Sequence, residues 1–240
     1  MISFVRAFTA PKRDDAPNED RHAKSLDGRA CAVSDGASVA FDSGPWAEIL
    51  AHGFVDGASF TTAWIKNAAI AYEAGYDRDA LDWMQQGALD RGSFASLLGV
   101  RPALARGSIE VLAVGDSALA ILDAGEVQHT MPYTRPEQFD ASPQLISTSA
   151  AKNEPIFRDV EAIPTSIIDL RPFASPCLLL MTDALGHWLV SHPDRAHELT
   201  EKLSEQEFEE FVVTERRAGR LRRDDTTLLI MDCDVAPNSH

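Results

Sequence analysis

Residues 30–36 read Ala-Cys-Ala-Val-Ser-Asp-Gly, a short apolar run that stops at an acidic residue, Asp35. Two further runs stop in the same way: Val-Leu-Ala-Val-Gly-Asp-Ser at 111–117 and Leu-Leu-Leu-Met-Thr-Asp-Ala at 178–184. At 224–231 the order is reversed, and Asp-Asp-Thr-Thr leads into Leu-Leu-Ile-Met. A continuous apolar run bounded by small polar residues is typical of a strand buried on both faces. Four such strands predict that their aspartates meet at one edge of a sheet stack.

A single aspartate after a strand has an ordinary explanation, because its side chain hydrogen-bonds nearby backbone in turns. Turn chemistry does not explain why each one lies beside the most apolar runs of the chain. Carboxylates about 4 Å apart repel by roughly 1 kcal/mol in water and by about 4 kcal/mol at an effective dielectric near 20. A cluster therefore needs cations between its members, and all-oxygen ligands favour hard ions such as Mg²⁺ or Mn²⁺. Two such ions can activate a shared water and clamp a phosphoryl oxygen.

Composition narrows the classes of partner. The 240-residue chain is 45% hydrophobic and carries a formal net charge of -15. No basic stripe is present to neutralise phosphates, which argues against nucleic acid. The three cysteines are far apart and form no CxxC pair, as expected of reduced thiols in a cytosolic protein rather than of a zinc site. We find no signal-peptide pattern and no membrane-spanning stretch, so we expect a soluble, cytoplasmic protein that binds no membrane. The oligomeric state stays open.

No repeat, linker or low-complexity block divides the chain, and we expect one domain over residues 1–240. Apolar patterns predict strands at 1–8, 28–34, 93–100, 108–114, 118–122, 126–131, 166–170, 177–181 and 226–232. Helical spacing predicts helices that begin near Trp46 and near Trp64, a third at about 78–90, and helical structure from about 184 to 218. Residues 132–165 are rich in proline and polar residues, and so long a connection is usually functional. Strands and helices are segregated rather than alternating, which indicates an α+β fold with mostly antiparallel sheets.

Five short motifs occur in order: Asn18-Glu19-Asp20, Val33-Ser34-Asp35-Gly36, Gly115-Asp116-Ser117, Thr182-Asp183 and Asp224-Asp225-Thr226-Thr227. Together they resemble the metal-dependent Ser/Thr protein phosphatases of the PPM (type 2C) family, in its bacterial form. The resemblance spans nearly the whole chain. It implies a four-layer αββα sandwich, in which two antiparallel sheets face each other with helices outside. It also implies a centre of two Mn²⁺ or Mg²⁺ ions at one end, with a weaker third ion.

The resemblance assigns a role to each motif residue. Asp35 would bridge the two metals, and Gly36 would lend its backbone carbonyl to one of them. Asp116 matches a position that helps to hold the third ion. The remaining metal ligands would be Asp20, Asp183 and Asp224. Asp35 and Asp20 would be the catalytic residues. Glu19 and Asp225 would not bind metal themselves but would contact the residues that do.

The chain departs from the family at three positions. Relatives place a phosphate-binding arginine shortly before the Glu-Asp pair; here that spacing reaches Asp15, and Arg13, slightly upstream, is the candidate for this role. Ala184 stands where relatives often have glycine. Ala37 stands where eukaryotic relatives have a histidine proposed as a general acid, so leaving-group protonation would fall to metal-bound water.

The resemblance implies a phosphatase that hydrolyses phosphoserine or phosphothreonine in proteins, through a metal-bridging hydroxide, in a signalling role. Two alternatives stay open. The first is a pseudo-phosphatase that binds phosphoproteins without turnover, which the missing arginine and Ala184 favour. The second is a two-metal hydrolase of a small phosphorylated metabolite. The physiological substrate and the part played by residues 132–165, including that of a flap over the site, are not determined by the sequence.

Overall fold

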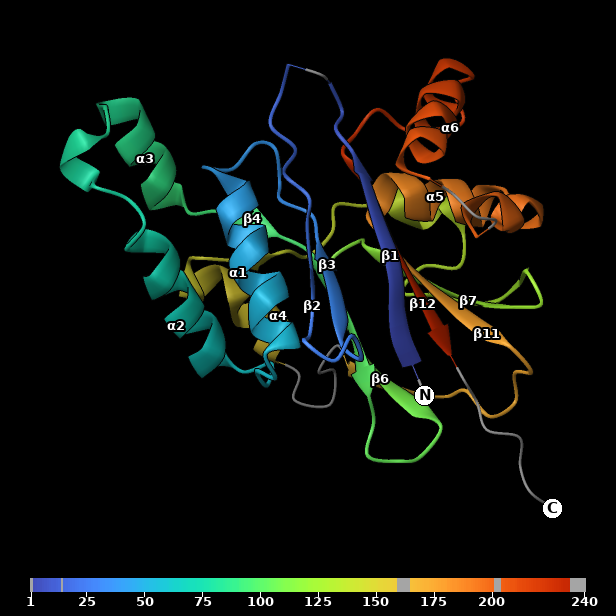
Figure 1. Ribbon diagram of the computed structural model, residues 1–240. Coiled ribbons are helices and arrows are strands. Elements are labelled where there is room, and N and C mark those ends of the chain that lie inside the picture. Colours follow the sequence, from blue (N-terminus) through green and yellow to red (C-terminus); the bar gives the residue numbers. More distant parts are fainter. Residues whose placement is uncertain (1, 14, 159–164, 201–203, 234–240) are drawn as a thin grey trace.

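Two five-stranded antiparallel sheets form the centre of the molecule (Figure 1). The computed structural model describes residues 2–13, 15–158, 165–200 and 204–233. One sheet has the order β1 (Ile2–Ala10), β12 (Thr226–Cys233), β11 (Pro176–Met181), β7 (Ala118–Asp123) and β8 (Glu126–Met131). The other has the order β10 (Thr165–Asp169), β6 (Ser108–Val114), β5 (Leu97–Pro102), β3 (Cys31–Ser34) and β2 (Arg21–Lys24). The short strands β4 (Phe94–Ala95) and β9 (Ile146–Ser147) pair separately.

The central strands are apolar on both faces because each sheet is covered twice. Successive side chains of a strand point to opposite faces. Val33 of β3 packs into the core between the two sheets, whereas its neighbour Ala32 packs into the core beneath the helices. In β12, Leu229 lies between the sheets and Leu228 faces the other helical layer. The continuous apolar runs of the sequence thus correspond to strands with two buried faces.

Helices cover the outer face of each sheet, which completes the four layers that the motifs led us to expect (Figure 1). On one side lie α1 (Ser43–Val55) and α2 (Thr62–Glu73), anchored by the fully buried Trp46. On the other side lie α5 (Asp183–Ser191) and α6 (Glu205–Arg217), anchored by the fully buried Trp188. The other helical segments are η1 (Arg78–Ala80), α3 (Trp83–Arg91), η2 (Pro136–Asp140), η3 (Ala150–Asn153), α4 (Glu154–Arg158) and η5 (Pro193–Leu199). No helix in the described part of the chain is long and apolar enough to cross a membrane.

Most of the expected elements are present, with three differences. Strand β2 was not expected, because Arg-His-Ala-Lys has one apolar residue; it pairs with β3 at the edge of its sheet, where charged side chains are common. The strand expected at 93–100 is broken at Ser96 into β4 and β5. The helix expected at 78–90 is a 3₁₀ turn, η1, followed by α3, which begins at a capping box formed by Asp82 and Gln85.

Residues 132–158 of the long connection contain short elements rather than an open loop. η2 packs against α5, and β9 joins β4 in a two-stranded ladder. η3 and α4 then lie beside α2 on the outer helical layer. Residues 159–164 of the connection lie outside the described part of the chain, as do 201–203 within the stretch expected to be helical.

Candidate metal centre

The pairing of β2 with β3 brings two of the aspartates together. Arg21 is opposite Ser34 in the antiparallel register. The residue before Arg21 and the residue after Ser34 therefore lie at the same end of the sheet. These residues are Asp20 and Asp35. The pairing of β2 with β3 therefore makes neighbours of two motifs that are separate in the sequence.

The other sheet brings its aspartates to the corresponding strand ends. Met181, the last residue of β11, is opposite both Ala118, the first residue of β7, and Leu228 near the start of β12. The remaining three aspartates of the set lie beside these strand ends: Asp116 and Asp224 in the segments that lead into β7 and β12, and Asp183 at the first residue of α5, two residues after the end of β11. A hydrogen bond joins the two sheets here: the Thr182 hydroxyl donates to Asp20 Oδ2 at 3.0 Å.

Asp35 lies close enough to the other carboxylates for their negative charges to raise its pKa. Burial raises the pKa of Asp35 well above its usual value, and four neighbouring negative charges raise it further. Those charges belong to Asp20, Asp183, Asp116 and Asp224. The four other aspartates that the resemblance assigns as metal ligands therefore lie within electrostatic range of Asp35 at one end of the sandwich.

The pKa values of two other aspartates of the group, Asp20 and Asp183, are also raised. Burial, followed by the charges of Asp225 and Asp183, raises the pKa of Asp20 to about 8, against hydrogen bonds from Thr227 and Thr182 that lower it. Burial and the charges of Asp116 and Asp224 raise the pKa of Asp183 to about 7. Carboxyl groups whose pKa values lie this high are poised to take up protons or cations.

Serine side chains hold the backbone at Asp35. The Asp35 amide donates to Ser96 Oγ at 3.0 Å, and the Ser96 hydroxyl also bonds the hydroxyl of Ser117 at 2.7 Å. Ser34 Oγ donates to the Ser96 carbonyl at 2.5 Å. The break between β4 and β5 at Ser96 makes these bonds possible. This positioning role of Ser96 was not expected from the sequence, because no local pattern indicates it.

Gly36 lies where a side chain has no room. A Cβ built on Gly36 would lie 2.8 Å from Ser43 Oγ and 2.9 Å from Ser43 Cβ, at the first turn of α1. Gly36 also forms an isolated bridge with Ala95. The start of α1 is therefore packed directly onto the Asp35-Gly36 backbone.

Behind the aspartates, Asp225 and Glu19 form a hydrogen-bonded layer with Lys12. Asp225 is 2% exposed and accepts from the amides of Lys12 at 2.6 Å and Glu19 at 2.7 Å. The Glu19 carboxylate accepts from Lys12 Nζ at 2.5 Å and from the hydroxyls of Ser38 and Ser43 at 2.6 Å and 3.0 Å. Burial opposes ionisation of Glu19, yet the hydrogen bonds from Lys12 and the serines lower its pKa. Lys12 is a site neighbour that the sequence did not single out.

Arg13 lies differently from Lys12. Its side chain is 63% exposed, and its Nε is 3.9 Å from Asp15 Oδ1. Among the described residues, this is the one ion pair found for Arg13. Arg13, which the sequence suggested as the phosphate ligand, is thus exposed to solvent in the loop between β1 and β2.

The donor set suits a hard divalent cation. Asp20 Oδ1 is buried and has no hydrogen-bond partner among the described residues, although a buried carboxylate oxygen normally has one. The surrounding donors are carboxylate oxygens, the set preferred by Mg²⁺ and Mn²⁺. Within the described ranges, no three histidine, cysteine or acidic side chains stand close enough together to hold an ion as they are. Like charges repel, so closer approach of these carboxylates requires cations or protons between them.

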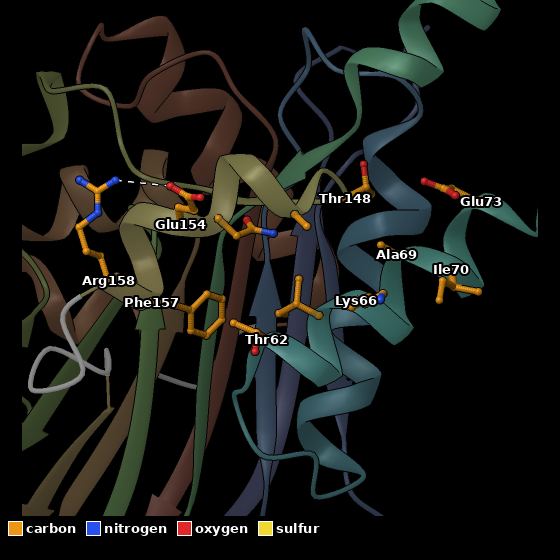
Figure 2. A pocket seen from close by; sticks show the side chains of 12 residues that line it. Thr62, Lys66, Ala69, Ile70, Glu73, Thr148, Glu154, Phe157 and Arg158 are labelled. Atoms are coloured by element: carbon orange, nitrogen blue, oxygen red, sulfur yellow. Dashed lines mark hydrogen bonds and ion pairs between the residues drawn. The ribbon is translucent and has the colours of Figure 1, made fainter.

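A cavity of about 480 Å³ lies elsewhere, between α2 and the segment formed by η3 and α4 (Figure 2). Its walls include Ile65, Ile70 and Phe157, with Lys66 and Glu73 at the side of α2. None of the aspartates of the candidate centre lines it. The carboxylates are instead gathered at the strand ends.

Comparisons with known proteins bear on the fold. No family model matches the chain, and no curated protein matches its sequence. Solved structures do match over nearly their whole length. The serine/threonine phosphatase PstP of Mycobacterium tuberculosis is 16% identical, with a TM-score of 0.60 and coverage of 98% of this chain and 99% of that one. Stp1 of Staphylococcus aureus is 13% identical, with a TM-score of 0.59 and coverage of 96% and 94%.

A further structure of the PstP catalytic domain, in complex with two manganese ions, is 19% identical, with a TM-score of 0.58 and coverage of 96% and 97%. At these identities the likeness establishes the architecture. The two antiparallel sheets and the helical layers outside them agree with it. The chain therefore has the fold of the PPM-type serine/threonine phosphatases, as its five motifs led us to expect.

Proposed function

We propose that this protein is a metal-dependent phosphatase that removes phosphate from phosphoserine and phosphothreonine in proteins. The observation that carries the proposal is the gathering of four aspartates from two sheets around Asp35. The fold supports it, because the matching solved structures are described as serine/threonine phosphatases. Manganese in one of those structures supports a divalent cation as the cofactor.

In this proposal, two Mn²⁺ or Mg²⁺ ions, and a third more weakly, are held by Asp20, Asp35, Asp116, Asp183, Asp224 and the carbonyl of Gly36. When bound, such ions supply an activated water near neutral pH and stabilise the charge on the phosphoryl oxygens. Asp35 would bridge the pair, which agrees with its place among the other four carboxylates. Asp20 would use the buried oxygen that has no hydrogen-bond partner in the described part of the chain.

The residues around the ligands would keep them in place. The Thr182 hydroxyl orients Asp20 through Oδ2 and leaves Oδ1 for a cation. The Ser96 hydroxyl holds the backbone at Asp35. Asp225 and Glu19 support the same region from behind, because Asp225 accepts the Glu19 amide and Glu19 binds the start of α1 through Ser43. Partners of this kind fix ligand orientation, and their loss typically costs ten- to a hundredfold in metal affinity or activity.

The direct experiment is hydrolysis of p-nitrophenyl phosphate and of a phosphothreonine peptide, with Mn²⁺ and with a chelator. We expect activity that requires Mn²⁺ and is lost in Asp35→Asn. A matched control is Asp232→Asn, which makes the same charge change at the exposed, opposite end of β12. Hydrolysis that persists in the chelator, or that survives Asp35→Asn, would exclude the proposed chemistry.

Binding without turnover is the second candidate function. The observation that favours it is the placement of Arg13, whose exposed side chain pairs with Asp15. Mn²⁺ binding by calorimetry, together with no hydrolysis of any phosphopeptide, would identify this case. Hydrolysis of small phosphorylated metabolites in preference to phosphopeptides would instead assign the site to a metabolite phosphatase.

A further inference from the structure

Arg222 is a positively charged neighbour of two carboxylates of the candidate centre, those of Asp116 and Asp183. It lies in the segment between α6 and β12, two residues before Asp224. The Phe139 backbone that Arg222 contacts lies beside α5: a Cβ on Gly186, three residues after Asp183, would be 3.2 Å from the Phe139 ring and 2.7 Å from Cβ of Ala118, two residues after Asp116. In agreement with this placement, burial raises the pKa of Asp116 and of Asp183, and the positive charge of Arg222 counteracts the rise. The Arg222 side chain is 34% exposed. The guanidinium therefore stands at the border between the carboxylates and solvent.

Two contacts hold Arg222 there, and both are made with the end of η2. Arg222 Nη1 donates to the Phe139 carbonyl at 3.1 Å, and Nη2 donates to Asp140 Oδ1 at 2.5 Å. Phe139 is itself anchored: it is 5% exposed and packs edge-on against Tyr133 at 4.7 Å between ring centroids. Gly186 of α5 allows this close packing, because a Cβ there would lie 3.2 Å from the Phe139 ring.

The two contacts of the Arg222 guanidinium differ in how easily another group can replace them. The Phe139 carbonyl belongs to a segment anchored by a buried ring, so it keeps the guanidinium in place. The Asp140 side chain is 68% exposed, and an ion pair so open to water contributes little. A phosphate monoester carries about two negative charges near neutral pH and offers three strong acceptor oxygens, and arginine binds such groups in bidentate fashion. Phosphate is therefore the stronger partner for the same guanidinium.

We propose that Arg222 binds the phosphate group of the substrate and that Asp140 occupies the guanidinium until phosphate displaces it. This inference rests on the proposed phosphatase function and names a second candidate, besides Arg13, for the phosphate-binding role. The same segment borders the site through Phe139, which packs against Tyr133 and lies 3.2 Å from the Cβ position of Gly186 in α5, the helix that begins at Asp183. Residues 133–140 thus form the substrate side of the centre.

The competing interpretation is that Arg222 balances the charges of Asp116 and Asp183 and touches no substrate. The two interpretations differ in what they predict for phosphate binding. Loss of a phosphate ligand weakens phosphate binding, whatever the loss of its charge does to divalent-ion binding. Loss of a balancing charge leaves phosphate binding unchanged and strengthens divalent-ion binding, because a positive charge no longer opposes the cation.

The experiment measures binding of orthophosphate to the Mn²⁺-loaded protein by calorimetry. We expect Arg222→Met to weaken orthophosphate binding by about tenfold, which corresponds to about 1.4 kcal/mol. We expect Asp140→Ala to strengthen it by about two- to fivefold, since the competing anion is gone. The matched control is Arg223→Met, which removes the same charge from the adjacent, exposed position and is expected to change binding by less than about twofold.

Arg222→Lys keeps the charge but removes the planar fork, and an intermediate loss is expected. If Arg222→Met does not fold, as judged by its thermal transition, Arg222→Lys and Asp140→Ala carry the test. Unchanged orthophosphate binding in both Arg222→Lys and Asp140→Ala, or tighter Mn²⁺ binding in Arg222→Met with unchanged phosphate affinity, overturns the proposal.

Because the readout is binding rather than turnover, the two proposals fail separately. A protein that binds orthophosphate through Arg222 but hydrolyses no phosphoester would overturn the proposed function and keep this inference. An active phosphatase whose KM and phosphate affinity are the same in Arg222→Met and in the unaltered protein would overturn this inference and keep the function.

Discussion

Thr182 Oγ1 donates a hydrogen bond of 3.0 Å to Asp20 Oδ2, although 162 positions of the chain separate the two residues. The same hydroxyl oxygen accepts the amide of Thr227 at 3.0 Å. One side chain therefore links the start of β2 to the end of β11 and the start of β12, and so joins the two sheets at the candidate centre. The orientation of Asp20 depends on this link.

Thr182→Val keeps the shape of the side chain and removes both hydrogen bonds. We expect Mn²⁺ affinity to fall by about tenfold, because Asp20 loses the donor that orients it. We also expect unfolding in urea to show a loss of about 1–3 kcal/mol, because a buried amide and a buried carboxylate lose a partner. Thr130→Val, on β8 at the edge of the same sheet, is the control. Equal Mn²⁺ affinity in the two variants would show that Thr182 does not orient a ligand.

Mn²⁺ should raise the melting temperature, and more strongly at pH 8 than at pH 6. Burial with neighbouring negative charge raises the pKa of Asp20 to about 8 and that of Asp183 to about 7. The folded protein without metal therefore keeps protons that the unfolded chain has lost, so its stability falls as pH rises through this window. Ionised carboxylates bind cations best, and binding at a hundred times Kd adds about 2.7 kcal/mol.

The measurement is a thermal shift series at both pH values, with Ca²⁺-free Mn²⁺ at millimolar concentration and a chelator blank. Asp35→Asn serves as the comparison, because it removes the carboxylate on which the other four act. No shift in melting temperature at either pH would contradict an organised carboxylate centre.

Gly36→Ala should disturb the centre through packing rather than charge. Its Cβ would lie 2.8 Å from Ser43 Oγ and 2.9 Å from Ser43 Cβ, so either α1 or the Asp35-Gly36 backbone must move. Overpacking of this kind typically costs about 1–3 kcal/mol of stability. The matched control is Gly87→Ala in α3, where the nearest atom is Arg91 Nη1 at 3.6 Å and alanine favours the helix by about 1 kcal/mol. Urea titration of both variants checks the prediction, which a stable Gly36→Ala variant would refute.

Glu215 provides a test far from the site. It is 2% exposed and accepts from Arg220, Arg195 and the indole of Trp188. The hydrogen bond from Arg220 is the main cause that lowers the pKa of Glu215, against burial, which raises it. A lowered pKa means that the ionised form stabilises the fold above the unfolded-state pKa, near 4.3, and that this contribution is lost as pH falls below it.

We therefore expect Glu215→Gln to cost about 2–3 kcal/mol at pH 7, somewhat less than a fully buried pair because both arginines are partly exposed. The difference from the unaltered protein should shrink between pH 5 and pH 3. Glu209→Gln, on the exposed face of the same helix, should change stability by less than about 0.5 kcal/mol. A difference that stays constant down to pH 3 would show that ionisation of Glu215 is not its source.

Patterns along the chain predicted the strands with two buried faces and the aspartates at their ends. The runs around Val33, Leu112, Leu180 and Leu229 are apolar at every position, and that property identified them as central strands. Strand β2 escaped notice because an edge strand with lysine and arginine has no such pattern. The broken strand at Ser96 escaped it because the break serves a hydrogen bond to Asp35, a residue 61 positions away.

The sequence by itself determined the strands with two buried faces and which aspartates lie at strand ends, since both follow from local hydrophobic order and residue type; the four layers were expected only from the family resemblance. Tertiary structure alone decided which side chains surround those aspartates. Thr182 reaches Asp20, Lys12 reaches Glu19, and Arg222 reaches Asp140 across distant segments. Strand register and helix packing set these pairings. The sequence around a residue does not indicate which distant side chain will contact it.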